Sequence, residues 1–217
     1  MKYEAVIFDL DGTLVDTLDD LTDSVNFALS SFGFPKRSRE EVRSFVGNGV
    51  RKLVYLSVPE GTDEETSEKC LGVFKEHYKN NSRNKTKPYD GIIEVLEKLC
   101  ESDVKTAVVT NKMQSAAKDI VEFFFGNKIS LAVGQVDGVA QKPNPDGVLL
   151  VLEKLGIKKE KAVYVGDSEV DCITARNAGV DCIGVTWGFR DAEVLKESGA
   201  RIIADSPDEI INLLDFN

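Results

Sequence analysis

The sequence is poor in the side chains on which many hydrolytic and metal sites depend. Its 217 residues include 1 histidine, 2 methionines, 1 tryptophan and 4 cysteines. The cysteines are scattered and form no C-x-x-C pair, so a zinc site with cysteine and histidine ligands is not expected. The single histidine, His77, lies in a polar helical stretch, and its isolation argues against Ser-His-Asp and Cys-His mechanisms. Any acid–base chemistry must therefore come from carboxylates.

Positive charge and long apolar runs are also scarce. Lys and Arg number 27 against 37 Asp and Glu, a formal net charge of −10. A chain this acidic repels phosphate backbones and anionic lipid surfaces, which argues against nucleic-acid and membrane partners. No run of about 18 apolar residues suggests a membrane span, and the N-terminal MKYEAVIFDLDGTLVD fits no signal peptide. The sequence predicts a cytoplasmic protein, and 42% hydrophobic residues are enough for a globular core.

Short β-branched apolar runs recur along the chain and predict buried parallel strands. They do not alternate with polar residues, as expected where both faces of a sheet are covered. The runs are residues 5–8, 107–109, 131–133, 162–165, 182–185 and 202–203. Amphipathic stretches that include Ile92 to Leu99 and Val148 to Leu155 lie between the later runs and predict helices. Strands that alternate with helices predict an α/β fold, a doubly wound parallel sheet with a Rossmann-like core.

One interval interrupts this alternation. Between Asp11 and Val104 the sequence contains no convincing strand, although a crossover needs only about a dozen residues. It contains helix signals instead, including two S/T-x-x-E capping boxes that begin at Ser38 and Thr62. We therefore predict an α/β core of residues 1–15 and 87–217 and an inserted helical domain of residues 16–86. The polar stretch at 80–88 is expected to act as a hinge or linker.

Polar residues follow several of the predicted strands, at the edge where ligands bind in open parallel sheets. In chain order they are Asp9, Asp11, Thr110, Asn111, Lys142, Asp167 and Asp171. Acids gathered at one edge suggest a divalent cation with oxygen ligands, most naturally Mg²⁺. A hydroxyl, an amide and a lysine at the same edge suggest an anion beside that cation.

These residues carry a resemblance to a known superfamily. The strings DLDGTLVDT, Thr110-Asn111, Lys142-Pro143 and GDSEVD follow the order of the four motifs of the haloacid dehalogenase-like hydrolases. An insert directly after the first motif is similar to that superfamily's helical cap. VTNK at 109–112, KPNPD at 142–146, GVTWGF at 184–189 and VGNGVRKLV in the cap most resemble the phosphoglycolate phosphatase group.

The resemblance implies a role for each core residue. Asp9 would attack phosphorus and form an aspartyl-phosphate, and Asp11 would act as general acid and base. Thr110 and Lys142 would hold the phosphoryl oxygens, and Gly12 and Asn111 would contribute to substrate binding. The implied metal ligands are Asp9, Asp11, Asp167 and Asp171, with Asp171 either a direct ligand or an orienting group.

The expected activity is Mg²⁺-dependent hydrolysis of a small phosphorylated metabolite, with 2-phosphoglycolate as the first candidate substrate. Arg51, in the cap, would then bind a second anionic group of the substrate. A sugar-phosphate mutase similar to β-phosphoglucomutase shares the same core residues and stays open, as does a pyrophosphatase. A phosphonate hydrolase is disfavoured by Asp11, and a dehalogenase by the full acidic set. A receiver-like signalling module would have about half this length and no large insert.

Overall fold

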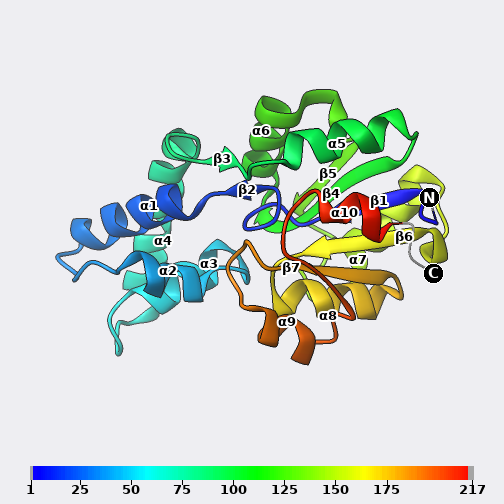
Figure 1. Ribbon diagram of the computed structural model, residues 1–217. Helices are drawn as coiled ribbons and strands as arrows, with labels where there is room; N and C mark the ends of the chain where they lie inside the picture. The colour runs from blue at the N-terminus through cyan, green and yellow to red at the C-terminus, as the bar shows by residue number, and fades with distance from the viewer. Residues whose placement is uncertain (1, 215–217) are drawn as a thin grey trace. The chain divides into compact units, whose positions relative to one another are not determined.

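The structure is a computed structural model that describes residues 2–214 (Figure 1). The chain forms two compact units. The first runs to Val15 and resumes at Pro88, and the second comprises Asp16–Lys87. Within residues 2–214, no helix has both the length and the apolar character needed to cross a membrane.

The first unit contains a parallel sheet whose central strand is the first in the chain. Its strands are β1 (Ala5–Phe8), β4 (Lys105–Met113), β5 (Leu131–Gln135), β6 (Ala162–Gly166), β7 (Asp181–Val185) and β8 (Ile202–Ala204). Their order in the sheet is β5-β4-β1-β6-β7-β8, and the paired strands run parallel. All six apolar runs in the sequence lie in these strands, so that prediction is confirmed.

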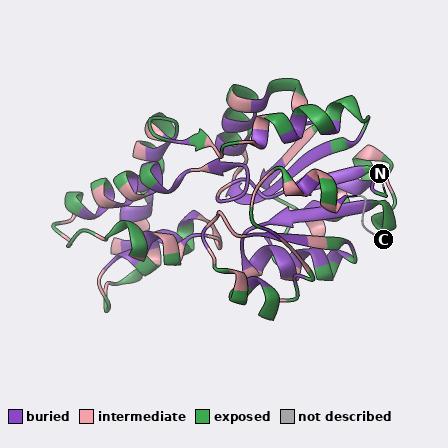
Figure 2. Cartoon of the chain, in the orientation of Figure 1, coloured by how far each residue is buried: buried purple, intermediate pink, exposed green. Residues whose placement is uncertain are grey.

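Helices cover both faces of this sheet. They are α5 (Ile92–Glu101), α6 (Gln114–Phe125), α7 (Asp146–Leu155), α8 (Glu169–Ala178), α9 (Ala192–Glu197) and α10 (Glu209–Leu213), with short 3₁₀ turns η1 (Gly126–Lys128) and η2 (Lys159–Lys161). On one face, Val6 and Phe8 of β1 join a core layer with residues of α5, α6 and α10. On the other, Ala5 and Ile7 pack with residues of α7 and α8. The strands are buried between these layers, as Figure 2 shows. The predicted doubly wound α/β fold is confirmed.

The second unit contains α1 (Leu18–Ser31), α2 (Arg39–Phe45), α3 (Gly49–Ser57) and α4 (Glu64–Asn81). The capping box predicted at Ser38 is present, since its hydroxyl accepts a hydrogen bond from Glu41 N and the Glu41 carboxylate accepts one from Ser38 N. The one predicted at Thr62 is wrong. Asp63 caps α4 by accepting from Thr66 N at 2.8 Å, and the Thr62 hydroxyl donates to Pro59 O instead.

The chain passes between the two units along two short strands, β2 (Val15–Asp16) and β3 (Lys87–Pro88), which pair with each other. A buried carboxylate, Asp20 on α1, anchors the segment that precedes β3. It accepts hydrogen bonds from Lys85 N at 3.0 Å, Thr86 N at 2.9 Å and the Thr86 hydroxyl at 2.8 Å. Most of the stretch expected to be a linker is thus the end of α4 and a segment bonded to α1.

Candidate active site

The site begins at the carboxyl end of β1. Asp9 is buried, and its backbone N–H donates to Val165 O on the neighbouring strand at 2.9 Å. The chain then turns through Gly12, whose φ of +89° lies in the left-handed region that favours glycine. A Cβ at this position would lie 2.4 Å from an oxygen of Asp167, so only glycine permits the close approach of these two segments.

Three buried carboxylates meet beside this turn. Oxygens of Asp9, Asp167 and Asp171 all lie within 4.8 Å of one another. Asp167 is held by the Thr13 hydroxyl at 2.9 Å and by Phe189 N at 2.8 Å.

Asp171 lies in the first turn of α8 and forms a capping box with Ser168, whose hydroxyl donates to it at 2.6 Å. Each carboxylate oxygen of Asp171 has a partner, because the other oxygen accepts from Lys142 Nζ. The fold therefore fixes the orientation of this side chain before any ligand binds.

Lys142 occupies the centre of the cluster. Its ammonium lies 2.8 Å from Asp9 Oδ1, 2.6 Å from Asp171 Oδ1 and 3.0 Å from the Tyr164 hydroxyl. The backbone of Lys142 is clamped by Asn111, whose side-chain oxygen accepts from Lys142 N at 2.8 Å and whose amide donates to Lys142 O at 3.0 Å. Asn111, predicted to bind substrate, thus positions this lysine.

The remaining predicted residues have different surroundings. Thr110 is buried, and its hydroxyl accepts from Lys112 N at 3.2 Å. The carboxylate of Asp11 is paired with Lys112 Nζ at 2.9 Å and lies outside the trio of Asp9, Asp167 and Asp171. The structure therefore brings three of the four predicted metal ligands together and gives the fourth, Asp11, a lysine partner.

Arg51 belongs to the second unit, on α3. Its side chain is 61% exposed and its guanidinium contacts Glu68 at 2.7 Å and Glu64 at 3.4 Å. It also lies against the Tyr55 ring and contacts its hydroxyl. Two carboxylates therefore already occupy the guanidinium that was predicted to bind a substrate carboxylate.

Burial and the closeness of other carboxylates raise the pKa values of two of these acids. Burial, reinforced by the charge of Asp171, raises the pKa of Asp9 to about 7, although Lys142 acts in the opposite direction. Burial likewise raises the pKa of Asp167 well above its ordinary value, again with Asp171 adding to the effect. Burial alone would lower the pKa of Lys142, but Asp171 and Asp9 outweigh it and raise that pKa.

The donor set fits a divalent cation. Asp9, Asp11, Asp167 and Asp171 carry four negative charges when ionised, and Lys112 and Lys142 carry two positive ones. Two unbalanced negative charges remain, which matches Mg²⁺, a hard cation that prefers carboxylate oxygens. Moreover, apart from its ion pair with Lys142 Nζ at 2.8 Å, the buried Asp9 Oδ1 has no hydrogen-bond partner among the described residues. The trio of Asp9, Asp167 and Asp171 would hold the ion.

Comparison with known proteins assigns this arrangement to a family. The model of the haloacid dehalogenase-like hydrolases matches residues 6–185, which include all seven core residues of the site. The chain belongs to this family. The fold and the enzyme class predicted from the sequence, a phosphoric monoester hydrolase, are thereby confirmed together with the phosphoglycolate phosphatase resemblance.

Several similar proteins have been named. Phosphoglycolate phosphatase 1 of Pseudomonas aeruginosa is 35% identical over 97% of this chain and 79% of its own length. The phosphoglycolate phosphatase of Psychrobacter arcticus is 34% identical over 91% of this chain and 89% of its own. Among solved structures, a candidate phosphoglycolate phosphatase from Lactobacillus delbrueckii subsp. bulgaricus is 34% identical, with a TM-score of 0.93 over 99% of both chains.

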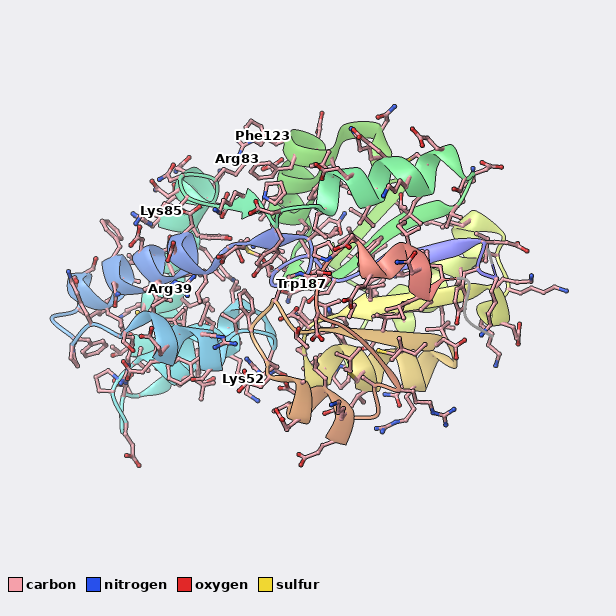
Figure 3. All side chains as sticks on the ribbon, in the orientation of Figure 1. Arg39, Lys52, Arg83, Lys85, Phe123 and Trp187 are labelled. Carbon is pink, nitrogen blue, oxygen red and sulfur yellow. The ribbon has the colours of Figure 1, made fainter. Side chains whose placement is uncertain are left out.

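Sequence reasoning missed several residues of the site. In the sequence, Lys112 is only the last letter of VTNK, and Tyr164 is only one residue of an apolar strand. Ser168, which holds Asp171, carried a usable signal, because a serine three residues before an acid, directly after a strand, resembles a capping box. Thr13, which holds Asp167, carried none of this kind. Trp187, labelled in Figure 3, packs against the core and donates to Thr13 O at 3.0 Å, so it has a packing role.

Proposed function

We propose that this protein is an Mg²⁺-dependent phosphatase that hydrolyses a small phosphate monoester through an aspartyl-phosphate on Asp9. The observation that supports it best is the position of Asp9, buried between Lys142 and the carboxylates of Asp167 and Asp171. By analogy with its named relatives, we take 2-phosphoglycolate as the first candidate substrate. The predicted cytoplasmic location belongs to the same proposal.

In the first half of the reaction, a carboxylate oxygen of Asp9 attacks phosphorus and the bond to the ester oxygen breaks. Asp11 gives a proton to the departing alkoxide. Lys142 and the Thr110 hydroxyl stabilise the phosphoryl oxygens, and Lys142 does so at little reorganisation cost because Asn111 and Tyr164 already fix it. Bound Mg²⁺ would supply charge neutralisation of the phosphoryl group and favour the ionised form of Asp9.

In the second half, a water molecule attacks the phosphorus of the aspartyl-phosphate. Asp11, now ionised, takes the proton of that water, and the bond between phosphorus and Asp9 breaks. Inorganic phosphate leaves and both aspartates return to their initial states. A mutase would instead transfer the phosphoryl group back to a sugar hydroxyl, so the ratio of phosphate released to substrate consumed distinguishes the two reactions.

The decisive experiment measures phosphate release from 2-phosphoglycolate, sugar phosphates, pyrophosphate and nucleotides, with Mg²⁺ and with a chelator. Asp9→Asn should abolish turnover and leave the fold intact, because an amide is neither a nucleophile nor a good metal ligand. Asp103→Asn, an exposed change in the same unit, serves as the matched control. If Asp9→Asn retained a tenth of the wild-type kcat, nucleophilic attack by Asp9 would be untenable.

A second variant tests Asp11. Asp11→Asn should still transfer a phosphoryl group from aryl phosphates, whose leaving groups need no proton, and should accumulate the aspartyl-phosphate detectable by its mass. Alkyl esters should slow by about 10²- to 10⁴-fold, the usual contribution of general acid–base catalysis. Equal losses on aryl and alkyl phosphates would contradict this role.

A further inference from the structure

The first unit contains a second buried lysine that the proposed reaction does not use. Lys112 lies near the end of β4, its side chain is only 3% exposed, and its Nζ lies 2.9 Å from Asp11 Oδ1. Lys142, in contrast, contacts Asp9 and Asp171. The two buried ammonium groups therefore stand beside different carboxylates, one beside the nucleophile and the other beside the acid–base residue.

Local structure holds the backbone of Lys112 in place. The pairing of β4 with β5 shifts register between Val109 and Met113, so this segment leaves the regular ladder. Lys112 N donates to the Thr110 hydroxyl. On the other side, Gly134 of β5 comes so close that a Cβ there would lie 2.6 Å from Lys112 O. The position of Lys112 is thus set by the same strand end that presents Thr110.

The pair geometry shows which part of a substrate Lys112 can reach. In the proposed reaction Asp11 touches the ester oxygen, at a hydrogen-bond distance of about 2.7 Å. Because Lys112 Nζ lies 2.9 Å from Asp11 Oδ1, it lies within about 5.6 Å of that ester oxygen when Oδ1 makes both contacts. A carboxylate on the carbon next to the ester oxygen places its own oxygens about 3 Å from it, which leaves room for one charge-assisted hydrogen bond to Lys112.

Electrostatics favour Lys112 over Arg51 as the residue that binds a second anionic group of the substrate. The protein as a whole is acidic, so a substrate with a second anion needs a locally positive group. Arg51 is exposed and already paired with Glu64 and Glu68, which would repel an incoming carboxylate. Lys112 is paired as well, with Asp11, but this pair is buried and includes the residue that would touch the ester oxygen. A buried charge–charge contact is screened less by water and salt.

We propose that Lys112 is a specificity-determining residue, which binds an anionic group of the leaving alcohol one carbon from the ester oxygen. This inference rests on the proposed function and adds to it the residue that selects the substrate class. On substrate binding, Lys112 contacts the substrate anion beside Asp11, whereas Lys142 contacts the phosphoryl group beside Asp9. Phosphate esters of small α-hydroxy acids are the class that fits.

The test compares 2-phosphoglycolate with its carboxamide analogue, which has the same size and the same ester but no second negative charge. The wild-type enzyme should prefer the carboxylate by about ten- to a hundredfold in kcat/KM, the usual effect of one hydrogen bond to a charged group. Lys112→Met should remove this preference, whatever it does to overall rate. Lys112→Arg keeps the charge and should keep most of the preference.

Lys105→Met is the matched control, since Lys105 lies at the other end of β4, is half-exposed and pairs with Asp103. It should leave the preference unchanged. Thermal unfolding of each variant shows whether it is folded, and the Lys112→Arg result tests the proposal even if Lys112→Met does not fold.

Two results would overturn the inference while leaving the phosphatase in place. One is an equal preference for the carboxylate in the wild type and in folded Lys112→Met. The other is a wild-type enzyme that hydrolyses both esters equally well. If the wild type releases phosphate from neither ester, nor from any other monoester with Mg²⁺ present, the proposed function itself fails.

Discussion

The crowding of buried acids around Asp9 predicts that Mg²⁺ stabilises the fold more strongly at neutral pH than in acid. The pKa of Asp9 rises from its ordinary 3.8 to about 7 on folding, chiefly through burial. Between these two values the folded protein holds a proton that the unfolded chain has released. The free energy of unfolding of the metal-free protein therefore falls as pH rises through this interval, and becomes independent of this group above about pH 7.

The size of the effect follows from the shift. About three pKa units at 1.36 kcal/mol each correspond to about 4 kcal/mol, which sets an upper limit for the part of the loss at neutral pH that comes from Asp9. A cation bound by Asp9, Asp167 and Asp171 favours their ionised forms and restores this stability. The stabilisation by Mg²⁺ should accordingly increase by up to a few kcal/mol from about pH 5 to about pH 7.5.

The measurement is urea unfolding at both pH values, in EDTA and in Mg²⁺, on the wild type and on Asp9→Asn. The amide of the variant does not ionise, so its metal-free stability should depend less steeply on pH than that of the wild type. Asp103→Asn, with a 92% exposed side chain, should behave like the wild type. The reasoning is refuted if Mg²⁺ stabilises the wild type equally at both pH values, or if Asp9→Asn keeps the wild-type slope in EDTA.

Three further predictions concern single side chains. Tyr164→Phe removes the hydroxyl that accepts from Lys142 and donates to Val109 O, and should lower kcat about tenfold with little change in KM; an unchanged kcat would contradict a positioning role. Arg51→Ala should affect a carboxylated ester and p-nitrophenyl phosphate alike, because Glu64 and Glu68 already pair with the guanidinium, and a selective loss on the carboxylated ester in parallel kinetics would instead support substrate binding by Arg51. Asp20→Ala leaves two backbone N–H groups without their acceptor and should destabilise the protein by about 2–5 kcal/mol in urea unfolding, whereas exposed Asp23→Ala should cost much less.

The sheet was predictable from the sequence because buried parallel strands have an unusual composition. Residues 5–8 and 162–165 are continuous apolar runs, and both proved to be strands covered on two faces. Motif order likewise placed Asp9, Asp167 and Asp171 at one edge, since the carboxyl ends of parallel strands meet there. These inferences need only the local pattern of apolar residues and the direction of the strands.

Contacts between distant side chains were not predictable in this way. Lys112 and Asp11 are separated by 101 positions, and nothing in VTNK indicates that the lysine turns toward an acid. Tyr164 fits the apolar run of β6, and only its surroundings reveal that the hydroxyl serves Lys142. His77 lies in a polar helical stretch of the sequence, yet its ring stacks on Phe27 and bonds to Ser24, because it faces the neighbouring helix α1.

The pairing of β2 with β3 has a consequence for the rate at which the chain folds. The central strand β1 is made first, yet its partner β4 begins only at Lys105, so their pairing would close a loop of nearly a hundred residues. The helices of the second unit contact mainly one another, and β2 and β3 join Val15 to the region of Pro88. Once that unit has formed, the loop still to be closed consists of residues 9–14 and residues 89–104, which include α5, and its entropic cost falls accordingly. Assembly of the second unit would therefore speed the completion of the sheet, although it contributes no strand to it.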